Sequence, residues 1–200
     1  MNQFLKLTAA LLAALTVMIF HELPKSFVYN YKRGKKEPVS SLLYLPQYID
    51  PIGLIFATFV HAGFSKPYRF VFDSKKRAFL IGLTGFFSLI VYFLLGLLVY
   101  KGLFSGVDIE SLLLSQQYKV KFTYWYVCYF ILNSLGMFIV NIFPISVFNM
   151  GLCMAGISLP RFVAIVRKDG LTKFLLWVAL YIQSITNLSL QFVNFILRID

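Results

Sequence analysis

Long apolar stretches alternate with short polar ones along the whole chain. Helix-length apolar runs lie at about 4–20, 78–100, 122–142 and 171–197. Because a helix needs about 20 apolar residues to cross a bilayer, these runs predict four transmembrane helices. A further apolar run at 51–65 is too short to cross comfortably. Such a segment is tolerated at membrane depth only where protein covers it, so we expect it to be re-entrant.

Turn residues bracket this short apolar segment. Asp50-Pro51 precedes it and Lys66-Pro67 closes it. A residue before proline favours extended backbone, and both pairs are typical of turns. The pattern therefore predicts a membrane-embedded segment over about 42–67.

Composition also indicates a membrane protein. Of the 200 residues, 59% are hydrophobic and 14% are charged, whereas a soluble domain carries about 25% charged residues. We predict one all-α, polytopic integral membrane domain over 1–200, with a loop outside the cytoplasm at about 101–121. No small-residue cleavage pattern follows the apolar run that ends at Phe20, so we expect a retained helix rather than a signal peptide.

The net charge of +11 has a placement that favours a membrane over nucleic acid as the partner. Fourteen of the nineteen lysine and arginine residues lie at 25–36, 66–77 and 161–173. With four helices and one re-entrant segment, the positive-inside rule places both termini outside the cytoplasm. The same basic loops are suited to contact anionic lipid headgroups.

Small and polar residues predict which helix faces meet protein. Gly85 and Ser88 lie almost one turn apart, and small residues let membrane helices approach closely. The last apolar run carries several polar side chains that we expect to face protein rather than lipid. They are Gln183, Ser184, Thr186, Asn187, Gln191 and Asn194.

The end of the first apolar run carries the main candidate site. It reads His21-Glu22-Leu23-Pro24-Lys25. In a zinc helix of the form His-Glu-x-x-His, the two histidines share one helix face and hold the metal, while the glutamate polarises the metal-bound water. Here lysine stands in the place of the second histidine.

Several stretches together resemble the compact bacterial branch of the site-2 protease-type intramembrane zinc metalloproteases, over about residues 10–160. Their order and spacing follow the pattern of that family. The stretches are His21-Glu22-Leu23, Asp50-Pro51-Ile52-Gly53, Gly63-Phe64-Ser65-Lys66-Pro67, the small residues Gly85 and Ser88, and Asn141-Ile142-Phe143-Pro144-Ile145. The resemblance implies a bacterial cytoplasmic membrane protein.

The departures from the family pattern fall on the metal ligands. The second histidine of the family corresponds to Lys25, its ligand aspartate to Asn149, and the following glycine to Met150. Only His21 and Glu22 keep the family identity. With two of three ligands replaced, we expect no bound cofactor. We expect a zinc ion only if the protein is an active enzyme that binds the metal with non-standard ligands.

Two alternatives concern what replaced the metal. His61, the other histidine of the chain, could rebuild a metal site with His21 and Asn149. In the second alternative, the Lys25 ammonium occupies the metal space and pairs with Glu22 and Asn149, because charges at membrane depth are expensive unless paired. Lys25 could instead extend to the cytoplasmic interface.

Three functions follow from these readings. The first is a pseudoprotease that binds transmembrane or amphipathic client segments without cutting them. The resemblance places its client surface on Asp50, Pro51, Gly53, Lys66 and Pro67, because an extended client is expected to lie along such an edge. The second is an active zinc-dependent intramembrane endopeptidase with Glu22 as general base. The third is a structural, assembly or small-molecule-handling membrane protein.

Overall fold

The computed structural model describes residues 2–32, 38–67 and 74–197. In chain order the elements are α1 (Asn2–Lys32), α2 (Val39–Leu42), the short 3-10 helix η1 (Leu45–Tyr48), α3 (Pro51–Val60), α4 (Lys75–Phe104), α5 (Ile109–Leu114), α6 (Tyr118–Ile142), α7 (Asn149–Ile157), α8 (Leu159–Tyr181) and α9 (Ser184–Leu197). The described residues contain no strand, in agreement with the predicted all-α class. The short helix α5 lies within the predicted outer loop at 101–121.

Three helices, α1, α4 and α6, are each long and apolar enough to span a membrane. Helices α8 and α9 pass the same test only as a pair, and they are bent by 58° at the break between them. The protein is therefore an all-α polytopic membrane protein, with a fourth span if α8 and α9 form one broken helix.

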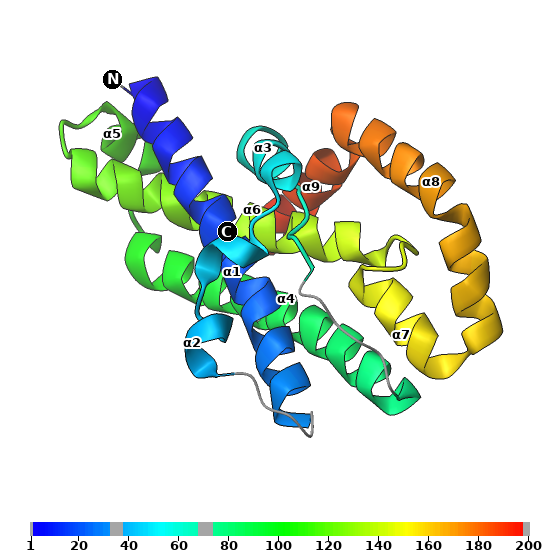
Figure 1. Ribbon diagram of the computed structural model, residues 1–200. Coiled ribbons are helices and arrows are strands. Elements are labelled where there is room, and N and C mark those ends of the chain that lie inside the picture. The colour runs from blue at the N-terminus through cyan, green and yellow to red at the C-terminus, as the bar shows by residue number, and fades with distance from the viewer. Residues whose placement is uncertain (1, 33–37, 68–73, 198–200) are drawn as a thin grey trace.

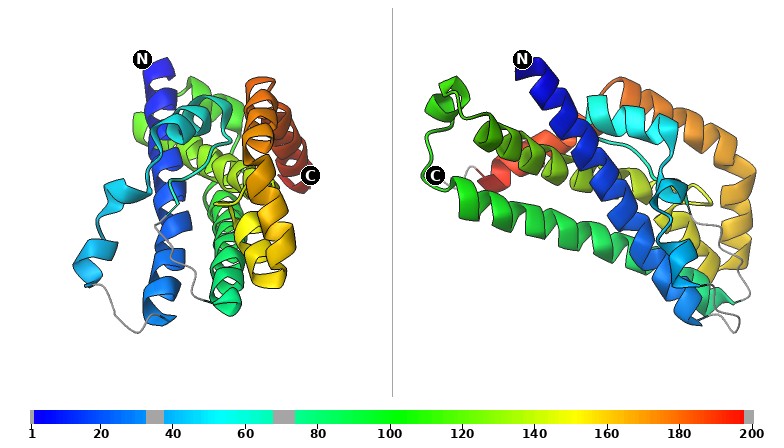
Figure 2. Two further views of the ribbon diagram at one scale, coloured as in Figure 1. Left: turned by 45° about the vertical axis from the view of Figure 1, so that its right-hand side comes forward. Right: turned by 60° about the vertical axis from the view of Figure 1, so that its left-hand side comes forward.

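The three long helices pack against one another and form the centre of the molecule (Figures 1 and 2). Buried Val17 and Met18 of α1 join Leu89 of α4 and Met137 of α6 in one apolar cluster. The short helix α7 lies along the first half of α4, where glycine permits close approach. A side chain on Gly82 would come within 2.6 Å of the Asn149 backbone oxygen.

The first helix is longer than its apolar run. It continues through Pro24 to Lys32, although Pro24 cannot donate the backbone hydrogen bond of a helix interior. The turn after Pro24 is held by packing and by side-chain hydrogen bonds. The Ser26 hydroxyl lies 2.8 Å from the Leu23 carbonyl and 2.9 Å from the Tyr48 hydroxyl. This extension carries Lys25 into the interior instead of leaving it at a helix end.

The predicted embedded segment folds out and back beside α1 (Figure 1). The Asp50 carboxylate begins α3 by accepting a hydrogen bond from the Gly53 amide at 2.8 Å. The helix ends at His61, which has the left-handed φ of 53° that often stops a helix. The chain then returns in extended form, and the Lys66 amide donates to the Tyr48 carbonyl at 3.0 Å. The two ends of the excursion therefore meet.

The last predicted helix, 171–197, differs from the structure at both its start and its middle. Helix α8 already begins at Leu159, with Pro160 in its first turn, where proline is well tolerated. The helix then breaks at Gln183, which has a left-handed φ of 57°. The prediction of one continuous helix was wrong because this break has no glycine or proline to mark it.

The polar side chains of this region mostly face outward. Thr186 is buried, and its hydroxyl donates to the Val60 carbonyl at the end of α3. The other five are exposed. Gln191 and Asn194 nevertheless line a cavity that α6 also lines, whereas the prediction that the side chain faces protein was wrong for Gln183, Ser184 and Asn187.

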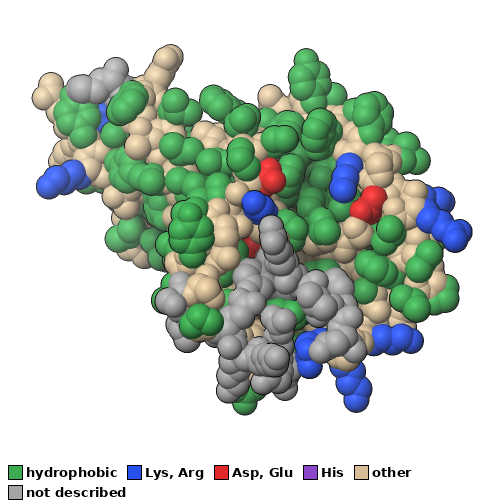
Figure 3. Space-filling model, viewed as in Figure 1, with side chains coloured by type: hydrophobic (Ala, Val, Ile, Leu, Met, Phe, Trp, Pro, Cys, Tyr) green, Lys and Arg blue, Asp and Glu red, His purple; other side chains and the backbone are tan. Residues whose placement is uncertain are grey.

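The surface has the character expected of a lipid-facing protein. Hydrophobic side chains cover much of the face in Figure 3, and lysine and arginine side chains lie mainly toward its edges. Phe59, Leu98 and Phe195 are each more than 60% exposed, at 66%, 66% and 77%. Parts of the predicted basic clusters lie outside the described residues: Arg33, Lys35, Lys36 and Arg69.

Candidate functional site

Helix α1 brings three polar side chains into the protein interior. His21, Glu22 and Lys25 are each only 1% exposed. Residues three and four apart share a helix face, so Lys25 lies one turn from both of the others. The Lys25 ammonium contacts Glu22 Oε1 at 2.6 Å. Residues 21 and 25 are the two positions that hold the metal in a His-Glu-x-x-His helix, so the structure places Lys25 on the predicted metal-binding face.

The returning leg of the embedded segment adds a hydroxyl to this face. Ser65 is buried, and its hydroxyl lies 2.7 Å from Glu22 Oε1 and 2.8 Å from His21 Nδ1. The sequence interpretation did not assign Ser65 a role. Its position inside the stretch Gly63-Phe64-Ser65-Lys66-Pro67, already singled out for its resemblance, was the available signal.

Asn149, the first residue of α7, completes the cluster. Its side-chain Nδ2 lies 3.1 Å from His21 Nε2, and its backbone amide donates to Asn141 Oδ1 at 3.2 Å. Helix α4 leaves room for it at Gly85, where a Cβ would come within 2.2 Å of Asn149 Oδ1. Asn141 and Gly85 therefore both position Asn149. All three residues lie at positions that the resemblance to the protease family singled out.

Helix α8 holds the turn that leads to Asn149. The Ser146 amide donates to Asp169 Oδ1 at 2.9 Å, and the Ser146 hydroxyl donates to Asp169 Oδ2 at 2.5 Å. Lys173 lies 3.8 Å from the same carboxylate. This anchor was not predicted, because no local pattern connects residue 146 with residue 169.

The hydrogen bonds of the cluster run in one direction, toward Glu22. A carboxylate can only accept, so Ser65 donates to Glu22 and its oxygen is free to accept from His21 Nδ1–H. His21 Nε2 then carries the lone pair and accepts from the Asn149 amide. His21 is thereby fixed as the neutral Nδ1–H tautomer. We refer to His21, Glu22, Lys25, Ser65 and Asn149 as the buried polar cluster.

The position of Lys25 decides between the alternatives drawn from the sequence. The side chain does not extend to the interface, because it is 1% exposed and paired with Glu22. The predicted contact of Lys25 with Asn149 does not form. Asn149 Oδ1 is buried without a hydrogen-bond partner, and the amide instead contacts His21.

His61 lies apart from this cluster. Its ring stacks on Tyr129 with centroids 4.5 Å apart, and it lines a different cavity. Both ring nitrogens of His21 already have partners, Ser65 and Asn149. The predicted grouping of His61 with His21 and Asn149 therefore does not occur.

The proposed client residues have mainly structural contacts. Asp50 caps α3, Pro51 occupies its first turn, and a Cβ on Gly53 would come within 1.9 Å of the Phe64 carbonyl. The side chain of Lys66 is exposed. A cavity of about 210 Å³ lies between this segment and α8, lined by Asp50, Ile52, Ser65, Pro67 and Trp177 among others. It connects the surface of the embedded segment with Ser65 of the cluster.

The donor set of the buried polar cluster does not fit a catalytic zinc ion. A catalytic zinc ion is held by three protein ligands drawn from histidine, cysteine and carboxylate side chains. Here the His21 Nε2 lone pair accepts from an amide, and the Glu22 carboxylate is paired with an ammonium. Within the described ranges, no group of three or more histidine, cysteine or acidic side chains could hold a metal.

Comparisons of the chain with protein-family models, curated proteins and solved structures matched none of them.

Proposed function

We propose that this protein is a catalytically inactive relative of the site-2 protease-type membrane proteases, and that it binds transmembrane or amphipathic client segments. The observation that carries the proposal is the 3.1 Å contact between His21 and Asn149. These are two of the three positions that the resemblance assigns to the metal ligands, and they are 128 residues apart in the chain. Their meeting supports a common origin of the site.

The charge of the cluster supports the loss of metal. A zinc ion with one glutamate and one aspartate carries no net charge, and neither does the Lys25–Glu22 pair beside a neutral asparagine. Removing one charge from a buried pair strands the other at a high energetic cost. The Lys25 ammonium therefore takes the place of the zinc ion in neutralising the Glu22 carboxylate.

The embedded segment supports client binding. Ile52 and Ile55 of α3 are 47% and 59% exposed, and the cavity between this segment and α8 is lined by Ile52. A client segment entering there would reach Ser65. We assign the client surface to Asp50, Pro51, Lys66 and Pro67 of this segment, of which Asp50 and Pro67 line the same cavity. Gly53 is buried and allows the Phe64 carbonyl to pack closely behind this surface.

An active zinc endopeptidase is the alternative, with Glu22 as general base. A general base must be free to take a proton from water. Glu22 instead accepts hydrogen bonds from Lys25 and Ser65, which favours the inactive protein.

Restoring the missing ligands tests the shared origin of the site. We expect the double variant Lys25→His, Asn149→Asp to bind about one zinc ion per chain, because three ligands would then converge. Metal analysis of the purified protein measures the stoichiometry. Wild type and the triple variant that adds His21→Ala should bind none. A double variant that folds but takes up no zinc would contradict the proposal.

A brominated transmembrane peptide tests client binding separately. Trp177 lines the cavity beside the embedded segment, so in a Trp125→Phe background its fluorescence reports on that cavity. We expect saturable quenching that Ile52→Ser weakens and Leu98→Ser, an equally simple change on the exposed face of α4, leaves unchanged. Quenching that rises in proportion to peptide would contradict client binding.

The orientation of the chain is part of the proposal. We propose that the basic clusters lie on the cytoplasmic side and both termini outside the cytoplasm, in the bacterial cytoplasmic membrane that the resemblance implies. A reporter enzyme that is active only outside, fused to the C-terminus, should be active. Activity of a reporter that works only inside the cell would reverse the orientation.

A further inference from the structure

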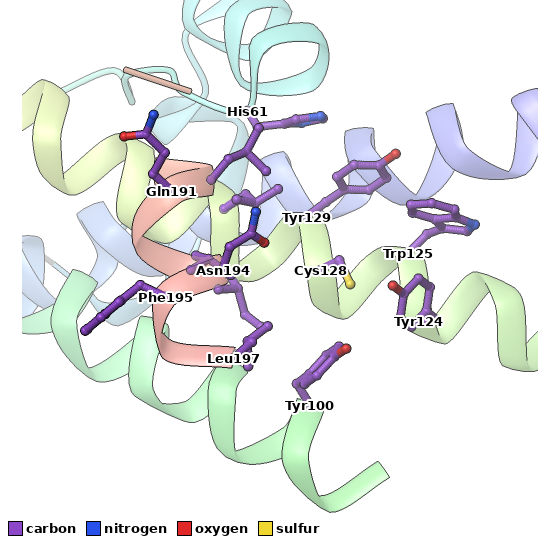
Figure 4. Close-up of a pocket in the computed structure, with 14 residues that line it drawn as sticks. His61, Tyr100, Tyr124, Trp125, Cys128, Tyr129, Gln191, Asn194, Phe195 and Leu197 are labelled. Atoms are coloured by element: carbon purple, nitrogen blue, oxygen red, sulfur yellow. The ribbon is translucent and has the colours of Figure 1, made fainter. Parts of the chain in front are cut away.

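A second cavity lies between α6 and α9 (Figure 4). Its volume is about 1010 Å³, which is at the upper end of the range for small-molecule sites. One end is formed by His61, at the end of α3, and the other by Tyr100 of α4 (Figure 4). None of the cluster residues lines it.

Aromatic rings form one continuous wall of this cavity. His61 stacks on Tyr129, and Tyr129 stacks on Trp125 with centroids 5.7 Å apart. Trp125 meets Tyr124 edge to face at 5.2 Å, and Tyr124 lies 6.3 Å from Tyr100. Tyrosine and tryptophan are favoured at membrane interfaces, so this wall is suited to a flat ring at headgroup level.

Polar groups of the opposite wall lack partners within the fold. The side-chain amides of Gln191 and Asn194 line the cavity and make no hydrogen bond to any described residue. His61 Nδ1 is buried with no partner in bonding geometry, although the Ala57 carbonyl lies near the ring. A polar group that is shielded from water without a hydrogen-bond partner costs free energy. An occupant that pairs with them would remove this cost.

The residues that line the cavity carry no formal charge, although the Lys6 ammonium lies 4.3 Å from the centroid of the Trp125 ring. The lining contains no lysine, arginine, aspartate or glutamate. The Tyr129 hydroxyl, the Trp125 indole N–H and the two amides supply hydrogen-bond donors to the lining, while the hydroxyls of Tyr100 and Tyr124 hydrogen-bond to each other. A matching ligand is neutral and presents acceptors.

We propose that this cavity binds a neutral, lipid-soluble molecule with a flat carbonyl-bearing ring, of the quinone class, held between the α6 aromatic wall and the amides of Gln191 and Asn194. The ring carbonyls accept from the amides, and an apolar tail extends into the bilayer. The backbone of a partner helix is already paired, so such a helix would satisfy the amides only with polar side chains placed opposite both of them. The proposal concerns binding only and is independent of the client function.

Two tryptophans allow a direct test in the full chain. Trp125 lines this cavity and Trp177 lines the other one. The probe is duroquinone, whose fully substituted ring resists addition by the Cys128 thiol. In phosphatidylcholine nanodiscs we expect duroquinone to quench Trp125 saturably in the Trp177→Phe variant. In the Trp125→Phe variant, Trp177 should be quenched only in proportion to duroquinone dissolved in the lipid.

Substitutions on α9 locate the binding site. We expect Asn194→Leu and Gln191→Leu each to raise the dissociation constant of duroquinone about fivefold, the effect of one lost hydrogen bond. Asn187→Leu is the matched control, because Asn187 is an exposed amide of the same helix that does not line the cavity. It should leave the dissociation constant unchanged. Using both Leu variants guards against one of them misfolding, which gel filtration detects.

Three results would overturn the proposal. The first is quenching of Trp125 that never saturates. The second is saturable quenching of Trp177 with the same midpoint, which would place the quinone elsewhere. The third is an equal loss of affinity in Asn187→Leu and Asn194→Leu, which would show a general effect of polarity on α9.

Discussion

The buried polar cluster and the cavity between α6 and α9 use similar groups in opposite ways. Each contains one histidine together with amide and hydroxyl groups. In the cluster both ring nitrogens of His21 have hydrogen-bond partners, whereas Asn149 Oδ1 has none. In the cavity the ring of His61 lies against Tyr129, while its Nδ1 has no partner.

The difference separates a structural polar group from one that is open to a ligand. Polar groups inside a membrane protein must be paired, and the pairing can come from the fold or from a bound molecule. The cluster is paired by the fold, so its substitutions should change stability. The polar groups of the cavity are not paired by the fold, so substitutions there should change ligand binding and leave the free energy of unfolding nearly unaltered. Three measurements of stability test this distinction.

The largest loss is expected for Lys25→Met, because it removes the buried ammonium that contacts Glu22 Oε1 at 2.6 Å. The free energy of unfolding in detergent should fall by about 3–5 kcal/mol. The double variant Lys25→Met, Glu22→Gln removes both charges and should recover at least half of that loss. A single variant as stable as wild type would mean that the ion pair does not contribute to the fold.

A smaller loss is expected for Ser65→Ala. The change removes the hydroxyl that links His21 to Glu22 and should reduce the free energy of unfolding by about 1–3 kcal/mol. Ser41→Ala is the matched control, since its hydroxyl makes an exposed hydrogen bond to the Pro38 carbonyl. That control should stay within about 0.5 kcal/mol of wild type. Equal effects of the two changes would argue against a special role of Ser65.

The smallest effect is expected for Asn194→Leu. Its amide has no partner in the fold, so the free energy of unfolding should stay within about 0.5 kcal/mol of wild type or increase slightly. The same unfolding assay applies. A loss as large as that of Ser65→Ala would show that the amide is held by the fold and would remove the contrast between the two regions.

Much of the membrane architecture could be predicted from the sequence, because it depends on local composition. The apolar runs near 4–20, 78–100 and 122–142 each fall within a spanning helix. The small residues of α4 pack closely on their neighbours as predicted, with Gly85 against Asn149. Helix spacing alone placed Lys25 beside Glu22.

The remaining features depend on contacts that no local pattern encodes. Pro24 lies inside α1 without ending it, and the Ser26–Tyr48 contact that stabilises the next turn joins distant segments. The break at Gln183 lacks a glycine, and the role of Ser65 requires the embedded segment to return to α1. Tertiary contacts overrode local preference at each of these positions.

The carboxylate of Asp169 links the C-terminal part of the chain to the buried polar cluster, although no residue of that part belongs to the cluster. Both of its oxygens hold Ser146, three positions before Asn149. A truncation that ended before α8 would keep every member of the buried polar cluster yet release the turn that orients its last one. Loss of function in such a deletion would therefore reflect a displaced asparagine as much as a missing domain.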